Sequence, residues 1–293
     1  MRKNSLNDVH LLNCISSILI NDSNLPSNIK ILDIGCGSGR LIHTLYKNLK
    51  KDFPSQSFEI YGMDVVDSGF IHDSSTPKGY ILDAIQDLGS DFPEINWSER
   101  IKLISSKDAW PYKENFFDFI VSNQVFEHIN NKKFTFSSID KFLKNNGHSF
   151  HLAQVKECLW EFHIQKPFAH WIRSERMLYF YIYSINILKN PFNAFQAKNR
   201  TKLHSLNETK FMLNQTSYAS VKTLKNFAES SDLSSDFDTS VFYYLIKLKK
   251  IFSRNAVSKF KYTALPTTFN TFLLFFLKRI SSVTLHLKKN KTS

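Results

Sequence analysis

The chain has 293 residues, of which 42% are hydrophobic and 22% are charged. This composition excludes an intrinsically disordered protein, and it supplies enough apolar residues for one large domain or for a core with an appendage. The formal net charge of +12 favours anionic partners, such as a membrane face, nucleic acid or an anionic saccharide or lipid carrier, without choosing among them.

The first segment of the chain predicts a helix over residues 6–20, because its apolar residues recur near the helical period. Polar residues interrupt the apolar run, which makes it a poor signal peptide, so the predicted localisation is cytoplasmic. The three cysteines, Cys14, Cys36 and Cys158, are odd in number and widely spaced. They therefore predict neither a disulfide framework nor a structural zinc site.

Short apolar runs and amphipathic runs then alternate along the chain. Strands that alternate with helices predict a parallel sheet with helices on both faces, and this rhythm covers about residues 29–157. The predicted strands are residues 30–34, 58–64, 101–104, 117–122 and 149–155. The predicted helices between them are residues 41–49, 81–88 and 134–143.

The character of the sequence changes after Pro167. Residues 168–190 are aromatic-rich and predict a helix, residues 191–240 are polar, and residues 241–283 are apolar and basic. We therefore expect two parts, a core over residues 1–165 and a mainly helical extension over residues 166–293.

A glycine loop follows the first predicted strand, with Asp33, Gly35, Gly37 and Gly39 at every second position. Glycines in such a loop let the backbone approach a ligand closely. The dinucleotide fingerprint G-x-G-x-x-G does not fit, because the third glycine comes one residue early. The Walker loop is excluded, because no Gly-Lys-Ser/Thr follows.

The loop sequence Leu-Asp-Ile-Gly-Cys-Gly-Ser-Gly resembles the first motif of class I S-adenosylmethionine-dependent methyltransferases, especially the methyltransferase type 11 group. Asp64 ends the second strand, where the family's acid holds the ribose hydroxyls. Asp108 and Ala109 follow the third strand, where the family's acid lies near the adenine amine. Residues 110–128, from Trp-Pro-Tyr-Lys-Glu-Asn-Phe-Phe-Asp to Glu-His, resemble a further family segment. The resemblance covers about half of the chain.

The resemblance implies an α/β fold, with a Rossmann-like, seven-stranded, mostly parallel sheet and helices on both faces, plus the C-terminal helical extension. It implies S-adenosyl-L-methionine as the cofactor. The residues that it assigns to the cofactor are Asp33, Gly35, Gly37, Gly39, Asp64, Asp108, Ala109 and Asn123. For some positions a structural role competes: Asp108 also suits a helix cap, and Cys36 suits packing under the loop. Glu127 and His128 suit the pocket wall, with His128 as a base the less favoured alternative.

A hydroxyl acceptor needs a base, because an alcohol is a poor nucleophile at neutral pH. Ligand crevices in open α/β sheets form at the carboxyl ends of strands, and residues 160–172 follow the fifth strand there. This segment resembles one in methyltransferases of surface polysaccharide and glycan biosynthesis. We expect His163 or His170 to accept the proton, with Glu161 orienting the base or the substrate. A packed His/Trp turn is nearly as good an interpretation. These three residues give only a weak indication of a metal site, so no metal is predicted.

The basic, aromatic tail has a Phe- and Leu-rich run over residues 268–277, too short to span a membrane, which needs about 20 residues. Residues 241–250 have a similar composition. Each segment suits packing on the core or at an oligomer interface. Together with the charge, they also suit peripheral association with an anionic membrane, at its inner face. A nucleic-acid partner is not expected, because the basic residues are dispersed.

Three functions compete. The first is O-methylation of a sugar hydroxyl in a surface glycan or its lipid-linked precursor. The second is methylation of a small metabolite, lipid or quinone. The third is a catalytically inactive, methyltransferase-like binding protein at a membrane. The sequence does not predict an oligomeric state.

Overall fold

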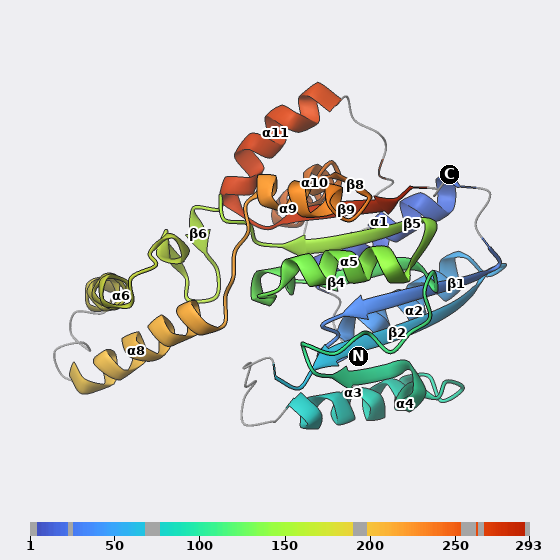
Figure 1. The fold of residues 1–293 in the computed structure, drawn as a ribbon, viewed down its shortest axis with the longest axis horizontal. Coiled ribbons are helices and arrows are strands. Elements are labelled where there is room, and N and C mark those ends of the chain that lie inside the picture. Colours follow the sequence, from blue (N-terminus) through green and yellow to red (C-terminus); the bar gives the residue numbers. More distant parts are fainter. Residues whose placement is uncertain are drawn as a thin grey trace.

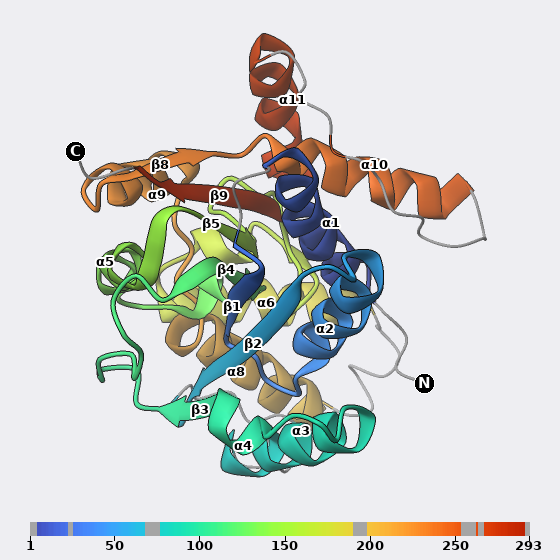
Figure 2. The same cartoon turned by 90° about the vertical axis from the view of Figure 1, so that its right-hand side faces the viewer.

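The computed structural model describes residues 5–22, 26–67, 77–189, 198–252, 262 and 267–290. Within them a seven-stranded sheet has the order β3-β2-β1-β4-β5-β9-β8 (Figures 1 and 2). Its strands are β1 (Asn28–Ile34), β2 (Ser57–Val65), β3 (Ile101–Ile104), β4 (Phe117–Asn123), β5 (Leu143–Ala153), β8 (Leu233–Asp236) and β9 (Val283–Lys289). A separate two-stranded hairpin consists of β6 (Trp160–Glu161) and β7 (Lys166–Pro167).

Helices connect and cover the strands. Those of the core are α1 (Leu6–Asn21), α2 (Arg40–Asp52), α3 (Pro77–Asp91), α4 (Trp97–Arg100), the 3-10 turn η1 (Phe126–His128) and α5 (Lys132–Phe142). Those that follow the hairpin are η2 (Ala169–Trp171), α6 (Glu175–Lys189), α8 (Lys198–Asn214), α9 (Val221–Glu229), α10 (Thr239–Phe252) and α11 (Thr267–Ile280).

Strands β1 to β5 run parallel, as the alternation of strands and helices predicts. Strand β9 pairs antiparallel with β5, and β8 pairs antiparallel with β9. These last two strands lie beyond residue 165, so the core sheet takes strands from both sides of the predicted boundary. The predicted fold class, a mostly parallel seven-stranded sheet with helices on both faces, is confirmed.

The central strands are buried because their side chains alternate between two apolar layers. Ile31 and Phe119 face the layer under α1, α2 and α10, while their neighbours Leu32 and Ile120 face the layer under α5 and α9. Strand β5 begins at Leu143, before the predicted start at residue 149, and a register irregularity opposite β4 accommodates the Asn-Asn-Gly stretch. The sheet thus holds the ends of β1, β2, β4 and β5 in fixed positions.

A pair of helices, α6 and α8, stands apart from the sheet as a lobe (Figure 1). A small cluster of buried apolar side chains joins the two helices to η2 and to the segment after α8. Its members are Ala169, Leu178, Ile182, Met212 and Tyr218. The β6–β7 hairpin therefore lies between the sheet and a lobe with its own small core.

Candidate active site

The glycine loop joins β1 to α2 and turns through three left-handed residues, Gly35, Gly37 and Gly39. A Cβ at Gly35 would lie 2.6 Å from Val125 Cγ2, and a Cβ at Gly39 would lie 2.8 Å from Leu88 Cδ1. Packing therefore excludes larger residues at both positions. A Cβ at Gly37 would meet nothing within 4 Å. The backbone at Gly37 consequently borders open space, which a ligand can enter.

Three carboxylates surround this loop. Asp64, at the end of β2, accepts hydrogen bonds from the backbone N–H groups of Gly37 and Val65, each at 2.8 Å. Asp33 is buried, and Asp8 of α1 is fully buried. Burial, together with the charges of Asp8 and Asp64, raises the pKa of Asp33 well above its usual value, although Arg40 opposes the shift. The loop region is therefore a site where a cationic ligand relieves repulsion between carboxylates.

The residues present fit S-adenosylmethionine. Its sulfonium and ammonium groups are cations, and Asp33 and Asp64 supply negative charge beside the opening at Gly37. When bound, this cofactor supplies a methyl group on a positively charged sulfur, already activated for transfer. The chain's part is to align the donor with an acceptor and to keep water out.

The other predicted cofactor residues lie around the same end of the sheet. Asp108 and Ala109 are exposed in the turn after β3, and Asp108 accepts a hydrogen bond from the backbone N–H of Ser105 at 3.1 Å. Asp108 thus stabilises its own turn. Asn123 ends β4, and its amide donates to Asp8 Oδ1 at 2.9 Å. This hydrogen bond links the carboxyl end of β4 to α1.

Two residues of this site, Asp8 and Arg40, do not appear among the predicted ones. Arg40 Nε donates to Asp8 Oδ2 at 2.8 Å, which ties α1 to the start of α2. Asp8 is also the third helical residue of a capping box with Ser5. The spacing Ser-x-x-Asp before an apolar run is a recognisable sequence signal for such a box. Its role beside the glycine loop depends on tertiary packing.

The acceptor side is built around Glu161, which the β6 strand places out of contact with water. The carboxylate accepts hydrogen bonds from His163 Nδ1 at 2.6 Å, the Tyr218 hydroxyl at 2.6 Å and the backbone N–H of Ile164 at 2.7 Å. Burial by itself raises the pKa of Glu161, but these three donors outweigh it and hold the pKa below its usual value. Glu161 therefore remains a carboxylate that orients the His163 ring.

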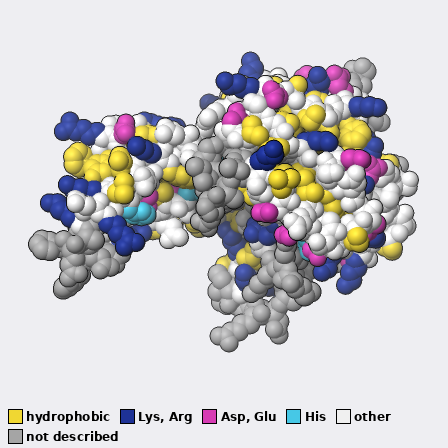
Figure 3. Space-filling model, turned by 90° about the horizontal axis from the view of Figure 1, so that it is seen from below, with side chains coloured by type: hydrophobic (Ala, Val, Ile, Leu, Met, Phe, Trp, Pro, Cys, Tyr) yellow, Lys and Arg dark blue, Asp and Glu magenta, His cyan; other side chains and the backbone are white. Residues whose placement is uncertain are grey.

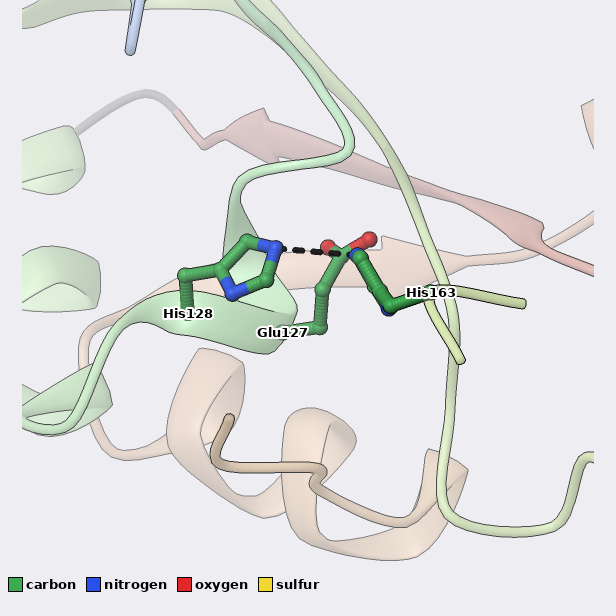
Figure 4. Close-up of side chains that lie close together, drawn as sticks. All are labelled: Glu127, His128 and His163. Carbon is green, nitrogen blue, oxygen red and sulfur yellow. Dashed lines mark hydrogen bonds between the residues drawn. The ribbon is translucent and has the colours of Figure 1, made fainter. Parts of the chain in front are cut away.

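His163 is partly accessible, and its second nitrogen, Nε2, lies 3.2 Å from Nε2 of His128. Burial alone lowers the pKa of His163, but the hydrogen bond and charge of Glu161 raise it overall. For His128, burial dominates and lowers the pKa to about 4. Figure 4 shows the two rings edge to face, with the carboxylate of Glu127 pointing toward them. Burial raises the pKa of Glu127 to about 7.

His170, the other candidate base, lies apart from this group. It is buried, and its Nε2–H donates to the carbonyl oxygen of Lys156 at 3.2 Å. Its ring packs 4.9 Å from that of Tyr218, centroid to centroid. The structure thus brings Glu161 and His163 together in a hydrogen bond, and places His170 behind Tyr218 in a packing position.

Val125 connects the two halves of the site. Its side chain fills the space beside Gly35, and Glu127 and His128 follow it directly in the 3-10 turn η1. His128 lies three residues after Val125, just beyond the carboxyl end of β4, and its ring faces that of His163; we call these two residues the histidine cluster. Open α/β sheets form their ligand crevices at this position.

Comparison with known proteins identifies the family and shows similar folds. The model of a family described as a methyltransferase domain matches residues 14–201. The structure of PKMT2 from Rickettsia typhi in complex with AdoHcy is similar in fold, with a TM-score of 0.53 and 16% identity. It covers 100% of this chain, which spans 55% of the Rickettsia chain. YcgJ from Bacillus subtilis has a TM-score of 0.45 and 12% identity, over 97% of this chain and 100% of its own.

No curated protein matches the chain significantly. The family match nevertheless covers more than half of the sequence, and it includes the glycine loop, the end of β2 and the histidine cluster. The chain belongs to the class I S-adenosylmethionine-dependent methyltransferases.

Proposed function

We propose that this methyltransferase transfers the methyl group to a sugar hydroxyl of a surface glycan or of its lipid-linked precursor. One observation carries the proposal: His163 is held 2.6 Å from the buried carboxylate of Glu161, and its Nε2 lies 3.2 Å from Nε2 of His128, just beyond the carboxyl end of β4. An oxygen nucleophile must lose a proton as the methyl group arrives, and a histidine held by a buried carboxylate has the geometry of a general base.

The proton then passes from the acceptor hydroxyl to His163, whose Nδ1–H remains hydrogen-bonded to Glu161. Glu161 stabilises the imidazolium that forms and fixes the orientation of the ring. The methyl group leaves the sulfonium for the oxygen, and the thioether keeps the electron pair of the broken bond. Methylation of a small metabolite, lipid or quinone uses the same base and is the second candidate.

The acceptor is found by incubating the full chain with S-adenosylmethionine labelled in the methyl group and fractionated cell-envelope glycans. We expect the label in a glycan or lipid-linked glycan fraction, in a linkage that survives mild alkali as an ether does. Label confined to small metabolites or free lipids would contradict the glycan assignment and favour the second candidate. No label in any fraction would favour a binding protein without turnover.

We propose, in addition, that α11 attaches the protein to an anionic membrane surface, where a lipid-linked acceptor resides. Phe272, Phe275 and Phe276 of α11 are exposed, and Lys278 and Arg279 follow them in the last turn. Exposed aromatic side chains beside cationic ones suit the interface of an anionic bilayer. Among the described residues, no helix combines the length and hydrophobicity that crossing a membrane requires.

The second basic, aromatic segment, α10, differs from α11 because its apolar side chains are buried. Val241, Phe242, Tyr243 and Ile246 are buried against the core, so packing accounts for most of this helix. Basic side chains elsewhere are spread among hydrophobic ones, over both the main body and the α6–α8 lobe, on the face seen in Figure 3. The dispersal on this face argues against a basic groove for nucleic acid there.

Flotation with vesicles tests the attachment. The protein is expected to float with phosphatidylglycerol-containing vesicles at low salt, and to remain at the bottom with purely zwitterionic ones. In the F272S/F276S variant the fraction of protein bound to vesicles is expected to fall at least about tenfold, because the variant removes two exposed rings from the apolar face. Leu82→Ser, an exposed apolar residue on α3, is the matched control. Equal flotation of F272S/F276S and the wild-type chain would contradict the role of α11.

A further inference from the structure

The proposed role of His163 as a base does not explain the surroundings of Glu127. It is 1% exposed, and neither of its carboxylate oxygens makes a hydrogen bond of good geometry among the described residues, although the backbone N–H groups of Glu127 and Gln154 lie near enough to lower its pKa somewhat against the effect of burial. A buried carboxylate without such bonds is costly, because a carboxylate removed from water needs a compensating charge or donor. The 3-10 turn η1 nevertheless directs this side chain toward His128 and His163 (Figure 4). Such an arrangement calls for a cation at the end of the carboxylate.

The two histidines present their Nε2 atoms to the same place. Nδ1–H of His128 donates to the carbonyl oxygen of Gln215 at 2.7 Å, and Nδ1–H of His163 donates to Glu161 at 2.6 Å. Since a carbonyl and a carboxylate only accept, these contacts leave each Nε2 as the ring's acceptor in the neutral form. A histidine whose outer N–H is held by a carbonyl or carboxylate is the usual form of a metal ligand.

The spacing of the ligand atoms suits one metal ion. The two Nε2 atoms are 3.2 Å apart, against about 3.4 Å for two nitrogens bound to one tetrahedral zinc. One ligand atom from each of Glu127, His128 and His163 lies within 4.8 Å of the other two. A modest side-chain rotation of Glu127 therefore completes a set of two imidazoles and one carboxylate.

We propose that Glu127, His128 and His163 bind a divalent first-row transition-metal ion such as Zn²⁺. Two neutral imidazoles and one carboxylate suit zinc and its neighbours, and they leave coordination positions open for water or a ligand.

The open position has a consequence for the acceptor, which rests on the function proposed above. A hydroxyl coordinated to the cation loses its proton to solvent more readily, because the cation stabilises the resulting oxyanion. In the metal-bound protein the cation thus replaces His163 in activating the acceptor, and His163 serves as its ligand. The metal site itself depends only on the three side chains.

Metal binding is measured on the full chain without an affinity tag and without methyl donor or acceptor. Titration calorimetry with Zn²⁺ is expected to give one strong site per chain. Co²⁺ is expected to give the visible absorption of a low-coordinate nitrogen and oxygen site.

Two variants locate the site. Glu127→Gln keeps the shape of the side chain and removes the charge, so the fold is retained while Zn²⁺ affinity falls at least about tenfold. His128→Ala is expected to weaken binding similarly, and His204→Ala, which changes an exposed histidine on α8, is expected to bind as the wild-type chain does. Zn²⁺ affinity that is absent in the wild-type chain, or unchanged in both E127Q and H128A, would overturn the proposal. Since no donor or acceptor is present, failure of methyl transfer leaves this result unaffected.

Discussion

Replacing His163 by alanine is expected to lower the rate of methyl transfer by about 10²–10⁴-fold, the usual contribution of a positioned acid–base group. The affinity for S-adenosylmethionine is expected to stay within about twofold, because the hydrogen bonds described for His163 join it to Glu161, Tyr218 and His128 and not to the glycine loop. Initial rates with the labelled glycan fraction give the first quantity, and titration calorimetry gives the second.

Two comparisons make the His163 experiment specific. His170→Ala is expected to cost less than about tenfold in rate, because His170 is buried behind Tyr218 and donates to a backbone carbonyl. His204→Ala is the control for removal of a histidine from the surface. If His163→Ala retained the wild-type rate while His170→Ala lost it, the assignment of the base to the Glu161 pair would be wrong.

Asp33→Asn is expected to weaken binding of S-adenosylmethionine at least about tenfold and, at the same time, to raise the thermal midpoint of the free protein. The two effects have one cause. Asp33 is a buried carboxyl beside Asp8 and Asp64, and in the free protein these effects outweigh the charge of Arg40 and disfavour its ionised form, which a bound cationic ligand favours. Asparagine has the same shape and removes both the repulsion and the attraction. Differential scanning calorimetry and titration calorimetry measure the two quantities, and a variant that is less stable with full affinity would contradict this account.

The same carboxyl predicts the pH dependence. The pKa of Asp33 is higher in the folded protein than in the unfolded chain, so its stabilising contribution is present at low pH and is lost as the pH rises through the folded value. Cofactor binding favours the ionised form and therefore releases a proton. Affinity for S-adenosylmethionine is expected to rise with pH across that range, and Asp33→Asn is expected to flatten the dependence.

Much of the fold could be predicted because the signals are local. The strand–glycine–helix succession at residues 31–49 and the apolar runs of β2, β3 and β4 lie where the sequence places them. The antiparallel strands β8 and β9 could not be predicted in the same way. Strand β8 has only 4 residues, and β9 acquires its partner β5 only through a pairing between residues 130 to 140 positions apart, from Ala153–Val283 to His148–Lys288.

In the candidate site, too, residues placed by local sequence signals could be predicted, and residues placed by long-range contacts could not. The positions of Asp33, Asp64 and the glycines follow from a motif in one contiguous stretch or at a strand end. The pairing of Glu161 with His163 is also local, since the residues are two positions apart on one hairpin. Tyr218 comes from a segment after α8 and donates to Glu161 only because the lobe folds back, which no periodicity in the sequence indicates.

Glu127 shows why a motif does not assign a role. The Glu-His pair after β4 is part of the family resemblance, which predicts that the pair forms a pocket wall. The fold adds the feature that matters, which is His163 from a distant hairpin at 3.2 Å from His128. Chemistry that depends on such a meeting of two segments becomes visible only in three dimensions.

The most direct test of the central claim is titration calorimetry of the full chain with S-adenosylmethionine, and separately with NAD, beside the Asp64→Ala variant. The account predicts one S-adenosylmethionine per chain, no measurable heat from NAD, and loss of most of the affinity when the carboxylate that faces Gly37 is removed. Absence of S-adenosylmethionine binding, or binding of NAD with comparable affinity, would contradict it.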